Sequence, residues 1–157
     1  SVIEPHVTSY VCWPADVDRN AHMNNARYAR VLNFARRAFW KRNGVWAHCI
    51  ARSPRANMVV VGASIRYRRE IPCFERYDVA TRLVHWDAAA FYVEHRFIRR
   101  ADHFILAVGL IKCGAAAARR DLGATCLVAY SCRRANRRAL SQVPRARARW
   151  PHCGGAA

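Results

Sequence analysis

The spacing of apolar residues predicts a strand, one long helix and then a run of strands. Val7 to Trp13 is short and rich in β-forming residues, which indicates a first strand. From Asn25 to Asn43 apolar residues recur at steps of three and four, so this stretch predicts an amphipathic helix. Asn24 or Asn25 is the expected N-cap, and Gly44 the expected end. The polar side of this helix is expected to carry Arg30, Asn33, Arg36, Arg37 and Lys41.

Extended segments dominate the next part of the chain. After a loop of Arg, Ser and Pro, no helical period interrupts three or four candidate strands, at 58–69, 77–86, 91–99 and 104–112. Their connections are short, so neighbouring strands are expected to be antiparallel. Residues 104–111 are apolar throughout, which suits a central strand. One long helix against an antiparallel sheet predicts an α+β architecture.

Length and charge divide the chain into two parts. The 157 residues, 53% of them hydrophobic, can bury one core, and we expect a single domain over residues 1–118. The net charge of +17 indicates an anionic partner: nucleic acid, lipid headgroups or a phosphate-bearing substrate. Residues 119–157 hold nine arginines against one acid, Asp121, and show no sustained apolar period. We expect this extension to be largely disordered, either as a solvated tail or as a basic arm that binds nucleic acid or an anionic membrane.

The cysteines and the chain start bear on the compartment. Seven cysteines, without a C-x-x-C motif or paired metal spacing, predict free thiols, no metal site and an intracellular protein, cytoplasmic or organellar. No run of 18 apolar residues is present. The chain begins with Ser1 rather than Met, so an upstream targeting or anchor segment is not excluded.

Polar chemistry is concentrated just before the predicted helix. A carboxylate, an amide and an imidazole fall at alternate positions, as Asp18, Asn20 and His22. A helix N-terminus leaves backbone N–H groups unpaired and carries partial positive charge, so it can stabilise a developing oxyanion. This arrangement predicts a hydrolytic site.

Two motifs carry a resemblance to the hot-dog fold thioesterases, which extends from about Val7 to Lys112. The loop 18–25, Asp-Arg-Asn-Ala-His-Met-Asn-Asn, resembles the D-x-N-x-H-V-N-N segment of plant-type acyl-carrier-protein thioesterases, and residues 67–70, Tyr-Arg-Arg-Glu, resemble their Y-R-R-E strand end. The His-Met-Asn-Asn-Ala-Arg-Tyr sequence is closer still to animal thioesterase-superfamily-member proteins. The resemblance implies a hot-dog fold, in which a sheet of five or six antiparallel strands wraps around one long helix.

The resemblance also implies an activity. It implies hydrolysis of an acyl thioester of fatty acid metabolism, carried by coenzyme A or acyl carrier protein, without a further cofactor. It further implies at least a homodimer, with the acyl slot at the subunit interface. The implied catalytic residues are Asp18, Asn20, His22 and Glu70. Two residues depart from the pattern: Ala21 stands where a glycine is common in the acyl-CoA branch, and Ile71 stands where some plant enzymes have a cysteine.

Thioester hydrolysis needs a donor array, a base or nucleophile, and an acyl slot. Backbone N–H groups around Asn24 and Asn25 are expected to polarise the carbonyl, and Asp18 or Glu70 to activate water or attack directly. His22 and Asn20 are expected to orient the carboxylate and the substrate. The remaining expected contacts are Arg27, with Arg19 and Arg66, for the phosphates of a CoA-type carrier, and Tyr28, Val59 and Val61 for the acyl slot.

Each of these residues has a simpler structural explanation. Asp18 is also a plausible turn or capping residue, His22 a structural histidine, and Glu70 one end of an ion pair with Arg68 or Arg69. Capping alone explains the two asparagines. The rival function is non-catalytic: the same fold binding an acyl ligand, or tethered to membrane or nucleic acid by its basic tail.

Overall fold

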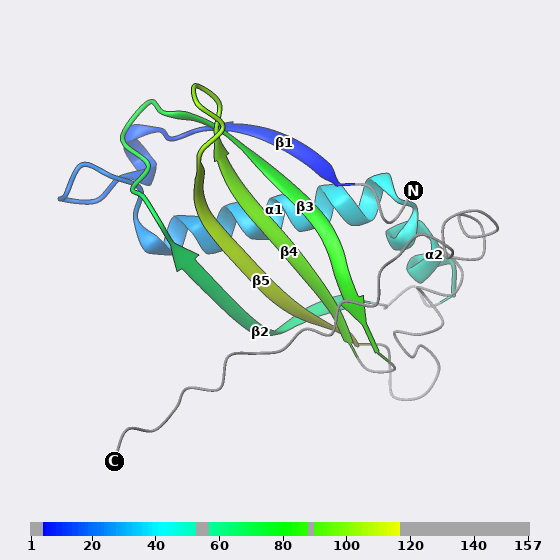
Figure 1. Cartoon of the computed structure of the whole chain (residues 1–157). Coiled ribbons are helices and arrows are strands. Elements are labelled where there is room, and N and C mark those ends of the chain that lie inside the picture. Colours follow the sequence, from blue (N-terminus) through cyan, green and yellow to red (C-terminus); the bar gives the residue numbers. More distant parts are fainter. Residues whose placement is uncertain (1–4, 53–56, 88–89, 117–157) are drawn as a thin grey trace, which may run out of the picture.

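The computed structural model describes residues 5–52, 57–87 and 90–116, so the predicted tail and the domain boundary at residue 118 lie outside the described residues. A five-stranded antiparallel sheet curves around one long helix (Figure 1). The elements are β1 (His6–Val11), a 3-10 turn (Pro14–Asp16), α1 (Asn25–Arg42), α2 (Val45–Arg52), β2 (Asn57–Tyr67), β3 (Arg76–Trp86), β4 (Ala90–Arg99) and β5 (Ile105–Ala116). The predicted hot-dog fold is confirmed.

The sheet has the order β1-β3-β4-β5-β2, and every pairing is antiparallel. The strand that follows the helices, β2, therefore lies at an edge and pairs only with β5. The β2–β5 register shifts between Val60 and Gly62, so Val61 is an extra residue in a β-bulge. The first strand stops two residues before the predicted end, since a 3-10 turn begins at Pro14.

Local signals set the bounds of α1, and they confirm the predicted helix. The Asn24 side chain accepts a hydrogen bond from the Ala26 N–H at 2.9 Å, which caps the N-terminus. At the other end Gly44 has φ +70°, a conformation that glycine adopts without strain. The sequence analysis predicts no helix after Gly44, whereas the chain forms α2 at once, with Val45 and Cys49 buried one turn apart.

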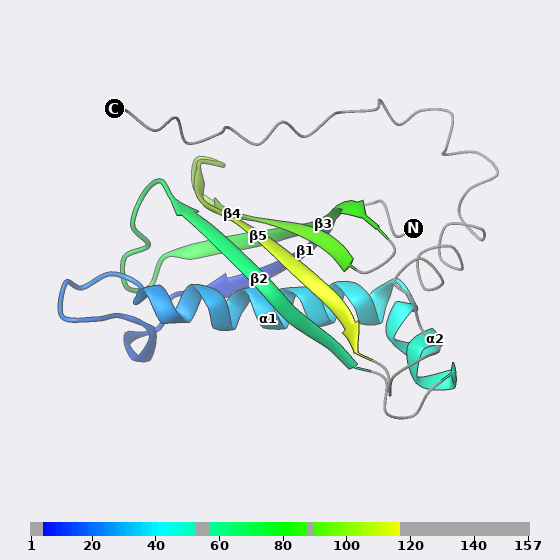
Figure 2. The same cartoon turned by 90° about the horizontal axis from the view of Figure 1, so that it is seen from below.

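One face of the sheet packs on α1, and the views in Figures 1 and 2 show the helix lying along it. Alternate residues of β4 are buried there, among them Phe91, Val93 and Phe97. In the middle of the helix Leu32 lies on Gly109 of β5, where an added Cβ would stand 2.9 Å from the Leu32 Cδ1 atom. Helix and sheet are therefore as close at this point as the leucine side chain allows.

Arg36 is a correction to the expected polar side of α1. Its side chain is buried, with 6% of the residue's surface exposed, although its helix neighbour Arg37 is exposed as expected. Neither helix in the described part of the chain is long and apolar enough to cross a membrane.

Candidate functional site

The polar loop before α1 and the segment after β2 are held together by backbone hydrogen bonds. The Met23 N–H donates to the Ile71 carbonyl at 2.8 Å, and His22 forms an isolated antiparallel bridge with Pro72. Nearby, the Phe74 N–H donates to the Cys12 carbonyl at 2.7 Å. These contacts bring the two motifs of the sequence analysis side by side at the start of α1.

A pocket of about 260 Å³ lies between them, and we call it the site pocket. Its lining comes from both motifs: His22, Met23, Asn25 and Tyr28 on one side, and Tyr67, Arg68, Arg69 and Glu70 on the other. Four predicted site residues, His22, Asn25, Tyr28 and Glu70, therefore share one cavity. Between them they provide an imidazole, a carboxylate, a phenol and the first residue of a helix.

His22 is half-buried, and its Nδ1 atom lies 3.4 Å from the Met23 carbonyl oxygen. A carbonyl only accepts hydrogen bonds, so this contact requires the proton to be on Nδ1. The Nε2 atom of the neutral ring then keeps its lone pair. A histidine in this tautomer can accept a proton from a reacting group.

Glu70 is exposed and has no ion pair with any residue that the structure describes. The expected alternative, an ion pair with Arg68 or Arg69, is wrong. Those two guanidinium groups lie over the Phe104 ring instead, with their central carbons 5.1 and 4.2 Å from its centroid. Glu70 thus lines the site pocket without an ion-pair partner among the described residues.

Tyr28 is almost fully buried at the base of the site pocket. Its ring packs edge-on against Tyr67, with the centroids 4.9 Å apart, and against Phe97 at 5.1 Å. Burial, reinforced by neighbours that include Tyr67 and Glu70, raises the pKa of Tyr28 to about 12. Its hydroxyl is therefore protonated at neutral pH and can donate a hydrogen bond.

The first turn of α1 has fewer available donors than the sequence analysis expects. The Asn24 N–H donates to the Asp16 carbonyl at 2.8 Å, and the Ala26 and Arg27 N–H groups donate to the side chain and the carbonyl of Asn24. Within the described part of the chain, the Asn25 N–H makes no hydrogen bond. The expected oxyanion donors around Asn24 and Asn25 are thus reduced to the Asn25 N–H.

Asp18 and Asn20 do not line the site pocket in this single chain. One carboxylate oxygen of Asp18 accepts a hydrogen bond from the Asn20 N–H at 2.8 Å. The Asp18 N–H in turn donates to the His22 carbonyl, and the two hydrogen bonds close a tight turn. Ala21, inside this turn, has φ 61°, the left-handed conformation that glycine favours. The structure therefore gives Asp18 the turn role that the sequence analysis left open beside the catalytic one.

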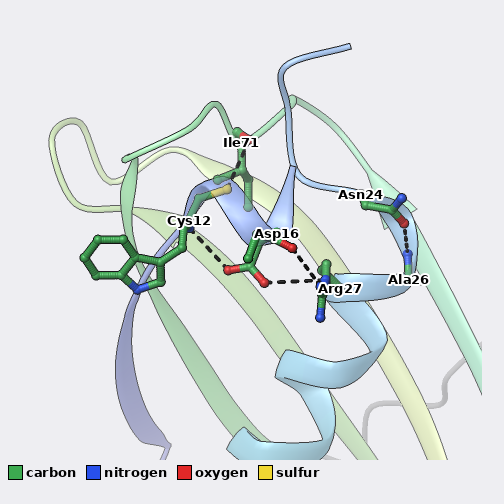
Figure 3. A network of polar contacts seen from close by, with 8 residues as sticks. Cys12, Asp16, Asn24, Ala26, Arg27 and Ile71 are labelled. Carbon is green, nitrogen blue, oxygen red and sulfur yellow. Dashed lines mark hydrogen bonds and ion pairs between the residues drawn. The ribbon is translucent and has the colours of Figure 1, made fainter. Parts of the chain in front are cut away.

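Asp16 is a structural residue that the sequence analysis missed. Figure 3 shows its carboxylate between the chain before the loop and Arg27 on the helix. Asp16 accepts the Trp13 N–H at 3.2 Å and lies 3.5 Å from the Arg27 Nε atom. Arg27 also donates to the Ala15 carbonyl at 2.7 Å, so this arginine, expected to bind phosphate, is held by its own chain.

Val59 and Val61, expected to line the acyl slot, are not among the residues of the site pocket. Both lie in the first half of the edge strand β2, and they are 43% and 60% exposed. With Val60, which is 41% exposed, they form a row of exposed apolar residues at the edge of the sheet. Among the described residues, no group of three or more His, Cys, Asp or Glu side chains lies close enough together to hold a metal ion.

Comparison with known proteins gives a family and a fold. Residues 12–150 match the model of the thioesterase-like superfamily. Protein THEM6 of Xenopus laevis is 41% identical over 107 residues, which cover 68% of this chain and 51% of that protein. The chain thus spans about half the length of this relative.

Two solved structures share the fold at low identity. One is Slr0204, a 1,4-dihydroxy-2-naphthoyl-CoA thioesterase from Synechocystis, with a TM-score of 0.69, 14% identity and coverage of 81% of this chain and 94% of that one. The other is the hypothetical protein SAV2348 from Staphylococcus aureus in complex with CoA, with a TM-score of 0.70, 12% identity and coverage of 85% and 87%. At these identities the similarity shows the fold alone.

Proposed function

Since this chain belongs to the thioesterase-like superfamily, we propose that it hydrolyses the thioester of an acyl group carried by coenzyme A or acyl carrier protein. The observation that carries the proposal is the site pocket, in which His22, Asn25, Tyr28 and Glu70 meet at the start of α1. An unpaired carboxylate, a histidine with a free ring nitrogen and two hydrogen-bond donors are the groups that acyl transfer to water requires.

The roles follow from the state of each group. The thioester carbonyl oxygen accepts hydrogen bonds from the Asn25 N–H and the Tyr28 hydroxyl, both of which are available donors. Glu70 removes a proton from water, whose oxygen attacks the carbonyl carbon, and the carbon–sulfur bond then breaks. The thiolate leaves and takes up the proton that Glu70 removed from water, with His22, which lines the same pocket, as the proposed relay. Direct attack by Glu70, with an anhydride intermediate hydrolysed by water, uses the same residues.

The carrier is proposed from charge and from the structural neighbours. Slr0204 acts on a CoA thioester and SAV2348 was crystallised with CoA, which supports a CoA-type carrier for this chain. Arg68 and Arg69 line the site pocket, and their guanidinium groups pair with no carboxylate in the described residues. They are the cations we assign to the carrier's phosphates, in place of Arg27.

A second copy of the chain is proposed to complete the acyl slot. The edge strand β2 presents unpaired backbone groups and the exposed Val59, Val60 and Val61. Exposure of such an apolar strand edge to water is unfavourable in a monomer. Pairing of two β2 strands would cover this row and place Val59 and Val61 at the interface, where the resemblance expects the acyl chain. Light scattering should give a dimer mass for the wild type and a monomer mass for Val60→Lys; a monomeric wild type at micromolar concentration contradicts the dimer.

The test of the activity is a hydrolysis screen over acyl-CoA and acyl-carrier-protein substrates of increasing chain length. Wild type is expected to hydrolyse at least one class, and Glu70→Gln to lower kcat/KM by about a hundredfold or more. Glu75→Gln is the matched control, since Glu75 lies 3.6 Å from Arg99 and does not line the site pocket. If wild type hydrolyses no substrate but binds acyl ligands, the fold serves as a non-catalytic binder and the proposal fails.

A further inference from the structure

A second cavity lies along the same helix, at the end opposite the site pocket. It has a volume of about 530 Å³, roughly twice that of the site pocket, and we call it the helix-end cavity. Its walls come from the second half of α1, from Trp46 of α2 and from Asn57 and Met58 at the start of β2. Figure 2 shows that α2 and the beginning of β2 meet at this end of α1.

A buried cation without a counter-ion lines the helix-end cavity. Arg36 is 6% exposed, and its Nη2 atom donates to the Asn33 side-chain oxygen at 2.8 Å. Throughout the described part of the chain, no carboxylate lies within ion-pair distance of Arg36. The neutral amide of Asn33 replaces only part of the hydration that the guanidinium group loses on burial, and burial of a charge without an opposite charge is unfavourable. The Arg36 guanidinium group is therefore suited to bind an anion.

The indole of Trp40 is a second unsatisfied donor in the same wall. Trp40 is 2% exposed and lines the cavity, yet its Nε1 atom is enclosed and has no hydrogen-bond partner among the described residues. A buried N–H group without an acceptor destabilises the fold, because it has given up its hydrogen bond to water. Since indole nitrogen can only donate, the missing partner must be an acceptor.

The rest of the lining agrees with an anionic ligand that has an apolar body. Arg37 and Lys41 add positive charge, and none of the described residues that line the cavity is acidic. Trp46, Met58 and Ala38 provide apolar surface. The volume falls in the range of small-molecule sites. The cations also lie toward the C-terminal end of α1, where the helix dipole stabilises positive charge.

We propose that the helix-end cavity binds the carboxylate of an apolar organic acid, with the Arg36 guanidinium as its ion-pair partner and the Trp40 indole N–H as a second donor. A carboxylate matches the planar fork of one guanidinium group and carries a single charge. A phosphate group carries more charge and more acceptor oxygens than one buried arginine and one indole can satisfy. The proposal does not depend on the hydrolytic activity of the site pocket.

The test uses decanoate as the probe, with decanol and inorganic phosphate as the comparison ligands. Proton–nitrogen NMR resolves the indole N–H signals of the five tryptophans, and Trp40→Phe identifies the one from Trp40. Decanoate is expected to shift the Trp40 signal in a saturable way, because the indole gains an acceptor. Decanol, which has the chain without the charge, and phosphate, which has the charge without the chain, are expected to leave it unchanged.

Variants then assign the contacts by titration calorimetry with decanoate. Arg36→Met keeps the length and apolar stem of the side chain and should weaken binding at least about tenfold. Trp40→Phe should weaken it about threefold to tenfold through the lost hydrogen bond. Arg42→Met is the matched control, since Arg42 lies exposed on the same helix and does not line the cavity. Its affinity should equal that of wild type.

Several outcomes overturn the proposal. The proposal fails if decanoate does not shift the Trp40 signal or if decanol shifts it equally. It also fails if phosphate shifts the Trp40 signal and decanoate does not. Equal affinity for a folded Arg36→Met and wild type would exclude the assigned ion pair, and if Arg36→Met does not fold, the NMR comparison and Trp40→Phe decide. Glu70→Gln separates the two sites, because decanoate binding at the helix-end cavity should persist in it whether or not wild type hydrolyses thioesters.

Discussion

The two ends of α1 carry opposite chemistry on one continuous helix. At the N-terminal end, the site pocket combines the Glu70 carboxylate with His22 and neutral donors. At the C-terminal end, the helix-end cavity is lined by cations and indoles and lacks an acid among its described residues. The first turn of α1 holds no acid, so Glu70 is supplied by the segment after β2, whereas Lys41 and Arg42 in the last turn are cations that the helix dipole stabilises. The comparison shows that one helix lines two cavities of unlike charge.

A second contrast lies within the site end itself. Asp18 and Glu70 are both carboxylates of family-like motifs, but one Asp18 oxygen is used by the Asn20 N–H, whereas Glu70 has no ion pair in the described chain. A carboxylate without a structural hydrogen bond is available to a substrate, whereas a carboxylate that accepts a hydrogen bond within a turn mainly stabilises that turn. The difference can be measured.

The largest expected effect separates these two acids. Glu70→Gln should lower kcat/KM for an acyl thioester by about a hundredfold or more, since it removes the base or nucleophile of the site pocket. Asp18→Asn should lower it by less than about tenfold, because the asparagine oxygen can still accept the Asn20 N–H. Steady-state kinetics on the same substrate measure both values. An equal, large loss in Asp18→Asn would place Asp18 in the chemistry, by way of a second copy of the chain.

The next effect concerns the part of the sheet nearest Arg36. His95 is buried, and its Nδ1 atom shares a hydrogen bond with the Thr81 hydroxyl at 2.9 Å. Burial, with a contribution from the Arg36 charge, lowers the pKa of His95 to about 3. An unfolded chain binds a proton at this histidine near its ordinary pKa of 6.5, so below that pH the unfolded state binds more protons than the folded state. Stability should therefore fall as the pH drops.

Between pH 6.5 and about pH 5, His95 alone should lower the free energy of unfolding by about 2 kcal/mol. Urea unfolding at the two pH values should show a smaller loss in His95→Gln than in wild type. His103→Gln, at an exposed histidine of the turn between β4 and β5, is the control and should retain the wild-type loss. The same loss in His95→Gln and wild type would show that the fold does not hold His95 neutral.

The smallest expected effect lies in the turn beside the site pocket. Ala21 adopts φ 61°, where a Cβ atom costs about 1 to 2 kcal/mol, and glycine removes this cost against a loss of chain entropy. Ala21→Gly should raise the free energy of unfolding by about 0.5 to 1 kcal/mol. Ala29→Gly, at an exposed position inside α1, should lower it by a similar amount. Chemical denaturation measures both; destabilisation by Ala21→Gly would mean that the turn is not strained.

Sequence reasoning succeeded where the signal is local. The helix α1, its Asn24 cap and its end at Gly44 follow from apolar spacing and terminal residues close along the chain, and the structure confirms them. Motif reasoning also placed His22 and Glu70 in one site, a convergence that depends on the hydrogen bond between Met23 and Ile71. That bond joins distant segments, and no local pattern encodes it.

The roles of Asp16 and Arg36 and the presence of α2 depend on the assembled fold, and the sequence shows no local pattern for them. Asp16 and Asp18 are alike in sequence, and only the path of the turn decides which of them holds Arg27. Arg36 occupies a polar position of the helical pattern, yet its side chain is buried where its charge acts on His95 of β4 and Cys113 of β5. The short helix α2 has too few residues to show a period of its own.

The contact of Leu32 with Gly109 limits the routes that a ligand can take. This contact falls between the two cavities along α1, and it leaves no room for even one methyl group between helix and sheet. At this point an acyl chain has no passage beneath the helix between the site pocket and the helix-end cavity. A ligand in either cavity would therefore have to enter from its own side of this contact.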